Sequence, residues 1–77
     1  MDIRQLKTFI DVAANGSYAR TAAITSSAQS ALSRQISALE RDIGGRLFHR
    51  TGRGVVLTEL GERMLPRARA LVADAAA

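Results

Sequence analysis

Residues 29–39 read Gln-Ser-Ala-Leu-Ser-Arg-Gln-Ile-Ser-Ala-Leu, and this stretch decides the fold. Leu32, Ile36 and Leu39 are four and three residues apart, and Ile43 continues the series, which is the spacing of one α-helix face. The other face carries Gln29, Ser30, Ser33, Arg34 and Ser37. Because Gln, Ser and Arg hydrogen-bond base edges and phosphates, this face indicates a helix that enters a DNA groove.

The composition indicates a single small domain. The chain has 77 residues, near the lower limit for a self-sufficient core. Apolar residues make up 47% but never form the run of about 20 that a membrane span needs. The chain has no cysteine, and Met1 leads straight into an amphipathic pattern rather than a signal peptide. We therefore expect a cytoplasmic protein, located at the nucleoid if it binds DNA, with no membrane partner.

The charge supports a polyanionic partner. The net charge is +4, and ten of the eleven basic residues are arginine, whose planar head suits phosphates and guanine edges. Residues 44–57 contain Arg46, His49, Arg50 and Arg53 and no acidic residue. Such a local excess is typical of a nucleic-acid contact.

Three helices are predicted in the first part of the chain. Apolar residues at helical spacing predict a helix at about 3–14, which ends at Asn15-Gly16 because this pair readily adopts the left-handed conformation. Ser17 is a typical N-cap and starts a short helix at about 18–24. Small polar residues then form a break before the helix at about 28–43.

A hairpin and a long helix follow. The β-prone runs 47–50 and 55–57 flank a turn at 51–54 that contains two glycines, which predicts a short hairpin. Thr58 is the expected N-cap of the last helix, and Pro66 inside that helix is expected to bend it.

Several blocks in this order match a known family. They are Arg4-Gln5-Leu6-Lys7-Thr8-Phe9, Gly16-Ser17-Tyr18, Gln29-Ser30-Ala31-Leu32-Ser33-Arg34-Gln35-Ile36 with Leu39-Glu40, Leu47-Phe48-His49-Arg50 with Thr51-Gly52-Arg53-Gly54, and Leu57-Thr58-Glu59-Leu60-Gly61. With these blocks the chain resembles, over nearly its whole length, the N-terminal DNA-binding domain of LysR-type transcriptional regulators.

The resemblance implies an all-α dominated fold. We expect a winged helix-turn-helix at 1–58, with a three-helix core and a short β-hairpin wing, and a linker helix that mediates dimerisation at 59–77. The helix at 28–43 would be the recognition helix in the major groove, with the wing tip at 52–54 at the minor groove. Family members continue into a C-terminal effector-binding domain. We therefore expect a fragment, with the effector ligand and any tetramer contacts outside this chain.

The sequence departs from the family pattern around the turn. Thr25 and Ser27 stand where the family usually has apolar core residues. Because burying an unpartnered hydroxyl costs roughly 1–3 kcal/mol, we expect the turn to be either locally rearranged or less stable. Ile24 is a candidate to compensate from the neighbouring position. Ala28 replaces a frequent serine cap, and Ser30 replaces a frequent proline. These changes put the local rigidity of the turn in question, but not the fold.

The recognition helix offers the candidate base contacts. Arg34 is expected to reach guanine or phosphate in the major groove; the alternative is a surface arginine paired with an acid of its own helix. Gln29 is placed to bind adenine, although N-terminal capping is an equally simple role. Ser33 is either a base or phosphate contact or a plain surface serine. Ser30 is a weaker candidate because the family residue differs.

Backbone and minor-groove contacts are expected elsewhere. Arg53 lies between two glycines and could enter a narrow minor groove; the alternative is a solvated turn. Arg50 is expected to bind phosphate or brace the wing. Ser17, Arg20 and Ser37 are further backbone candidates, although capping alone explains Ser17.

Catalysis and metal binding have no support in the sequence. His49 is the only histidine, and with no cysteine a metal site is not expected. Glu59 and Glu62 are typical acids of a helix N-terminus. We therefore expect no enzyme and no cofactor.

The last helix carries an apolar stripe: Leu60, Met64, Ala68, Leu71, Val72 and Ala75. The stripe either packs on the domain itself or forms an intersubunit seam. A helix of about 18 residues is ~27 Å long and overshoots so small a core, so we expect 68–75 to pair with a second copy. A two-fold dimer would require an inverted-repeat site with half-sites ~34–36 Å apart. The resemblance adds T and A at the outer ends of the site.

Two alternative functions remain open. The fold could serve protein–protein interaction, with the basic wing on an acidic partner, or bind nucleic acid without sequence preference. RNA recognition usually needs exposed aromatic rings, whereas Phe9, Tyr18 and Phe48 are all expected in the core.

Overall fold

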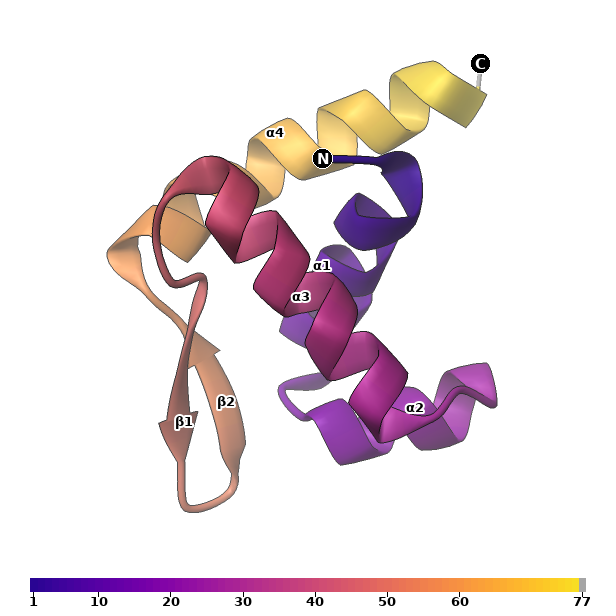
Figure 1. The fold of residues 1–77 in the computed structure, drawn as a ribbon, viewed down its shortest axis with the longest axis vertical. Coiled ribbons are helices and arrows are strands. Elements are labelled where there is room, and N and C mark those ends of the chain that lie inside the picture. The colour runs from indigo at the N-terminus through magenta and orange to yellow at the C-terminus, as the bar shows by residue number, and fades with distance from the viewer. Residues whose placement is uncertain (77) are drawn as a thin grey trace.

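The computed structural model describes residues 1–76, which form four helices and one two-stranded antiparallel sheet. The elements are α1 (Ile3–Asn15), α2 (Tyr18–Thr25), α3 (Gln29–Ile43), β1 (Phe48–Thr51), β2 (Gly54–Leu57) and α4 (Glu59–Ala76) (Figure 1). Their order confirms the predicted winged helix-turn-helix followed by a long helix. Within the described residues, no helix combines the length and the apolar character needed to cross a membrane.

The helix ends follow from local sequence. Asp2 caps α1: its carboxylate accepts from the Gln5 amide at 2.9 Å, and the Gln5 side chain accepts from the Asp2 amide at 3.2 Å. Gly16 ends α1 with φ at +70°, and Ser17 caps α2 by accepting from the Arg20 amide at 3.1 Å. The predicted stop and cap are therefore confirmed.

The core lies where α1, α3, α4 and the base of the hairpin meet. It comprises Leu6, Phe9, Val12, Ile36, Leu39, Leu47, Phe48, Val55 and Ala68. Phe9 and Phe48 pack edge to face, with ring centroids 5.5 Å apart. The α4 helix packs along α1, at the end of the molecule opposite the hairpin tip and the α2–α3 turn (Figure 1).

The hairpin strands differ slightly from the prediction. Thr51 pairs with Gly54 and Phe48 with Leu57, so the turn has only Gly52 and Arg53 at its tip. Two-residue connections are the commonest in hairpins because they match the twist of the strands. The strands therefore include Thr51 and Gly54, which the sequence had placed in the turn.

Of the two alternatives for the turn, the one with buried hydroxyls is not observed. Thr25 and Ser27 are exposed, and Thr25 Oγ1 donates to the Thr21 carbonyl at 2.8 Å and lies 3.0 Å from Ser27 Oγ. No desolvation cost therefore arises. Ile24 does not compensate for a missing core residue, because 65% of its surface is exposed. Within α2, the buried hydroxyl is that of Thr21, which donates to the Ser17 carbonyl at 2.7 Å.

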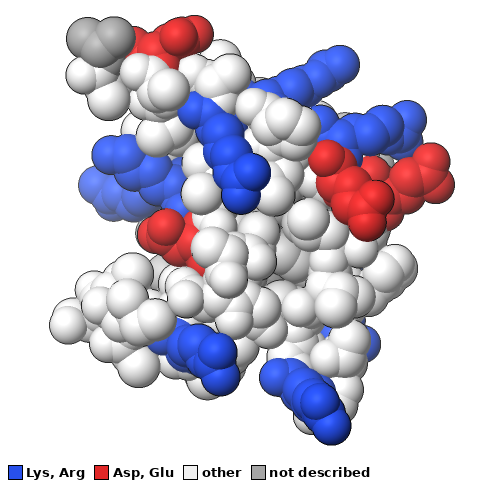
Figure 2. All heavy atoms as spheres, turned by 180° about the vertical axis from the view of Figure 1, so that it is seen from behind, with Lys and Arg blue, Asp and Glu red and all other residues white. Residues whose placement is uncertain are grey.

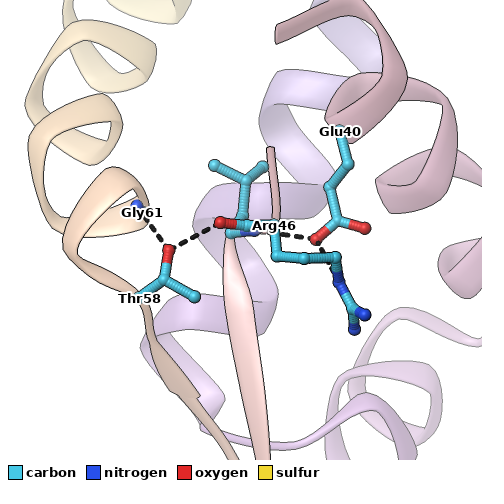
Figure 3. Close-up of polar contacts among 5 residues, drawn as sticks. Glu40, Arg46, Thr58 and Gly61 are labelled. Carbon is cyan, nitrogen blue, oxygen red and sulfur yellow. Dashed lines mark hydrogen bonds and ion pairs between the residues drawn. The ribbon is translucent and has the colours of Figure 1, made fainter. Parts of the chain in front are cut away.

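A polar junction holds the base of the hairpin between α3 and α4 (Figure 3). Thr58 Oγ1 accepts from the Gly61 amide at 2.9 Å, which confirms its capping role, and donates to the Arg46 carbonyl at 2.6 Å. The Glu40 carboxylate accepts from the Leu47 amide at 2.7 Å and pairs with the Arg46 guanidinium at 3.4 Å. The hairpin is therefore connected by hydrogen bonds to both neighbouring helices.

Candidate nucleic-acid interface

The polar face of α3 is accessible along its length. Gln29, Ser30, Arg34 and Ser37 are exposed, and Ser33 is half-buried. Ser30, Arg34 and Ser37 are spaced four and three residues apart, so they lie in one stripe along the helix. The buried residues of α3 occupy the opposite side, which leaves the stripe facing solvent.

Arg34 does not form the ion pairs considered as its alternative role. Glu40 is bound to Arg46, and Asp42 pairs with the amino group of Met1 at 2.5 Å. Among the residues that the structure describes, no acidic side chain pairs with Arg34. Its guanidinium is therefore available to an external anion or base.

The N-terminus of α3 also lacks a side-chain cap. Ala28 occupies the N-cap position and makes no side-chain hydrogen bond, while its carbonyl accepts from the amides of Ala31 and Leu32. Gln29 does not cap the helix, so that alternative is not observed. The first amides of α3 and the positive end of its dipole thus lie at the end of the helix where Gln29 and Ser30 begin the polar face.

Acidic residues are absent from this end of the molecule. No Asp or Glu occurs in 17–39 or in 43–58, which together contain α2, the turn, most of α3 and the hairpin. In Figure 2 the lower part of the face, formed by the hairpin and the helix-turn-helix, shows basic side chains and no acidic ones. The surface around the tip of the wing and the start of α3 is therefore electropositive.

The wing is fixed to the helix-turn-helix by a close backbone contact. The Val55 amide donates to the Gly16 carbonyl at 2.9 Å, and a Cβ on Gly54 would lie 2.1 Å from the same oxygen. Arg53 at the tip is exposed, and its amide donates to Thr51 Oγ1 at 3.2 Å. The tip and the α2–α3 turn lie at the same end of the molecule (Figure 1).

Arg50 lies over the ring of Tyr18, with its Cζ atom 5.6 Å from the ring centroid. Tyr18 is half-buried and packs edge to face on Phe48, with centroids 6.2 Å apart. Burial raises the pKa of the Tyr18 phenol; Glu40 adds to the rise and Arg50 opposes it. Sequence reasoning assigned Tyr18 to the core only, because nothing in a linear sequence shows that it meets Arg50.

Two shallow hollows lie on either side of the loop that joins α3 to the wing strand β1, and both are lined by Arg46. One of about 510 Å³ is lined by Ser37, Glu40, Arg41, Gly44, Gly45 and Arg46, and one of about 340 Å³ by Arg46, Phe48, His49 and Arg50. His49 is exposed, as expected. Arg41 was not proposed as a contact, although its spacing of seven from Arg34 places it on the same stripe.

The apolar stripe of α4 divides into two groups. Leu60, Met64 and Val72 pack against the core, and Ala68 is itself a core residue with 1% of its surface exposed. Ala68 cannot contribute accessible surface to a seam, because its small side chain is enclosed within the chain's own core. Leu71, with 47% of its surface exposed, and Ala75 face solvent.

Comparisons with known proteins agree with this geometry. The profile described as "Bacterial regulatory helix-turn-helix protein, lysR family" matches residues 3–62. The HTH-type transcriptional regulator TfdT of Cupriavidus pinatubonensis is 52% identical over 73 residues, which cover 95% of this chain and 32% of that protein.

Solved structures show the same fold. A CbnR_DBD–DNA complex has a TM-score of 0.94 and 41% identity, covering 99% of this chain and 87% of that one. A complex of BenM_DBD with benA site 1 DNA has a TM-score of 0.89 and 33% identity, covering 97% and 87%.

The chain belongs to the LysR family of bacterial regulatory helix-turn-helix proteins, and it forms the winged-helix DNA-binding domain of that family. The relatives are transcriptional regulators and not enzymes. The chain spans 32% of the length of TfdT.

Proposed function

We propose that this chain binds duplex DNA sequence-specifically, with the first half of α3 in the major groove and the wing tip at an adjacent minor groove. The observation that carries the proposal is the exposed stripe of Ser30, Arg34 and Ser37, which lies within a segment, 17–39, that contains no acidic residue. The CbnR and BenM complexes, which contain DNA, support the same use of the fold.

The side chains divide by the part of DNA that they suit. Arg34 has the donors to bind guanine bidentately, and Gln29 has the donor and acceptor that adenine requires. Ser30 and Ser33 supply hydroxyls to base edges or nearby phosphates. Arg53 at the exposed tip is suited to a narrow minor groove.

Backbone contacts would come from the surrounding elements. Ser17 and Arg20 at the start of α2, Ser37 on α3 and Arg50 on β1 all lie in the acid-free part of the chain. Contacts of this kind set orientation and affinity without reading sequence.

We further propose a two-fold homodimer in which Leu71 and Ala75 of α4 meet their counterparts. Both are exposed, and Val72 beside them is partly buried against the core. Such a dimer would select an inverted repeat, with T and A at its outer ends as in the family pattern. Effector binding and tetramer formation would lie outside this chain, and the protein would act at the nucleoid.

Selection from a random duplex pool tests the proposal. The bound fraction would be recovered and sequenced, and fluorescence anisotropy would follow affinity across a range of salt concentrations. We expect an enriched inverted repeat and a steep fall of log K with log salt, because each phosphate contact releases counterions.

Two outcomes would contradict the proposal. Steep salt dependence without an enriched motif would indicate non-specific binding. An enriched single half-site, together with a monomeric mass in solution, would retain sequence reading but reject the dimer. Arg69→Ala provides the matched control, because it removes one exposed arginine from α4 without touching the proposed interface.

A further inference from the structure

The contact between Tyr18 and Arg50 joins two elements that are proposed to meet DNA. Arg50 belongs to the wing strand β1, and Tyr18 is the first residue of α2, immediately after the capping Ser17. The guanidinium carbon lies 5.6 Å from the ring centroid, within the range of a cation–π interaction. The contact thus places a wing arginine beside the N-terminus of α2.

The ring itself is held firmly. Tyr18 packs edge to face on Phe48 at 6.2 Å, and Phe48 packs in the same manner on Phe9 at 5.5 Å. Phe9 and Phe48 are almost fully buried, with 1% and 3% of their surface exposed. Burial also raises the pKa of the phenol, so the ring stays neutral at physiological pH. Arg50 therefore rests on a fixed and uncharged platform.

An aromatic ring differs from a carboxylate partner because it leaves the N–H donors of the guanidinium free. A carboxylate would occupy the guanidinium donors and cancel the charge, whereas a ring restricts the side chain from one face and leaves the N–H groups at its edge available. Within the described part of the chain, no acidic side chain pairs with Arg50. The arrangement suits an arginine that must be ordered and still bind an anion.

The surroundings indicate where that anion would lie. Arg50 lines the 340 Å³ hollow between the wing strand and the neighbouring loop, together with Arg46 and His49. If α3 occupies a major groove and the wing tip the adjacent minor groove, the sugar–phosphate strand that separates the two grooves passes between α3 and the wing, next to the strand that carries Arg50.

We propose that Tyr18 is a positioning residue for DNA binding: it holds the Arg50 guanidinium beside the N-terminus of α2, where the guanidinium contacts a phosphate of the strand that separates the two grooves. The inference rests on the proposed function. It assigns to Tyr18 a role that acts through Arg50 and not through direct contact with bases.

A double-mutant cycle tests the inference. Affinity for a random-sequence duplex of about 30 base pairs, long enough for two half-sites one turn apart, would be measured for the unaltered chain, Tyr18→Leu, Arg50→Ala and the double variant. We expect Arg50→Ala to weaken binding roughly tenfold, as for a charged hydrogen bond. Tyr18→Leu should weaken it about two- to five-fold, the factor that matches an exposed cation–π contact.

The coupling between the two positions is the decisive result. Tyr18→Leu should have almost no further effect once Arg50 is alanine, and Tyr18→Phe should restore binding because it keeps the ring. A second cycle, of Tyr18→Leu with Arg20→Ala, serves as the control. Its effects should be additive, since Arg20 lies in the same helix and, among the described residues, the arginine over the ring is Arg50.

Additive effects of Tyr18→Leu and Arg50→Ala would overturn the inference and leave the proposed function intact. Equal coupling to Arg20 would also overturn it, because it would show that α2 as a whole had moved. Failure of the unaltered chain to bind any duplex at low salt would instead contradict the proposed function itself.

Discussion

Gly54 packs so closely on Gly16 that a Cβ atom at position 54 would lie 2.1 Å from the Gly16 carbonyl oxygen. The same oxygen accepts a hydrogen bond from the Val55 amide at 2.9 Å, and Gly54 has φ at +152°. At this point the wing and the segment that leads into α2 meet backbone to backbone, without intervening side chains. The position of the wing relative to α2 depends on this contact.

We expect Gly54→Ala to lower the free energy of unfolding by about 1–3 kcal/mol, because the added methyl strains the backbone and clashes with a carbonyl that cannot yield easily. Chemical denaturation monitored by circular dichroism would measure the loss. Gly52→Ala is the matched control, since nothing lies within 4 Å of its Cβ position. If Gly52→Ala lowered the free energy of unfolding as much as Gly54→Ala, the contact with Gly16 would not be the cause of the loss.

Thr58 is expected to be the most sensitive hydroxyl in the chain. It is 8% exposed, caps α4 and donates to the Arg46 carbonyl. Thr58→Val preserves the shape but removes both hydrogen bonds, and we expect a loss of about 2 kcal/mol. Thr58→Ser should retain most of the stability in the same denaturation experiment. A serine variant as unstable as the valine variant would mean that the methyl group, and not the hydroxyl, stabilises the junction.

Stability at high pH should depend on Tyr18. Its pKa lies above the ordinary value of 10.0, chiefly because of burial and secondarily because of Glu40. The folded state therefore favours the neutral phenol. This contribution is complete below pH 10.0 and is lost as pH rises through the folded pKa. We expect the free energy of unfolding to fall in that window.

The titration of Tyr18 can be followed without interference from other aromatic side chains of its kind. Tyr18 is the only tyrosine and there is no tryptophan, so phenolate absorbance reports this one group. Tyr18→Phe should remove the corresponding part of the alkaline loss of stability. An absorbance midpoint at or below pH 10.0 in the folded chain would contradict the burial of the phenol.

Replacement of Arg34 should alter sequence preference as well as affinity. A bidentate arginine contributes about 1–3 kcal/mol of discrimination at its base pair. Arg34→Ala should therefore flatten one position of each half-site in the selected motif, whereas Arg69→Ala should leave the motif unchanged. A uniform loss of affinity without a change in the motif would assign Arg34 to phosphate.

The proposed dimer can be separated from folding. Leu71→Glu places a charge on an exposed apolar position of α4, and we expect it to convert dimer to monomer by sedimentation equilibrium with little change in monomer stability. Ile24→Glu is the control, because Ile24 is 65% exposed but lies on α2. If the Leu71→Glu variant remained dimeric, the dimer interface would not involve this position of α4.

Sequence alone predicted what is determined locally. Helix periodicity located α3, and capping chemistry located the starts at Ser17 and Thr58, because these signals depend on residues within one or two turns. Contacts between distant segments could not be predicted in this way. The exposure of Thr25, the burial of Ala68 and the meeting of Tyr18 with Arg50 all depend on how the helices and the wing pack together.

The predominance of arginine has a consequence for regulation of this domain. Lys7 is the only lysine in the sequence, and it lies in α1, so the wing, α2 and α3 offer no amine to acylating enzymes or reactive metabolites. Arginine also keeps its charge at any pH compatible with folding, because a guanidinium group is not deprotonated in proteins. Neither lysine acetylation nor a moderate pH change can therefore remove the arginine charge by which this surface attracts DNA.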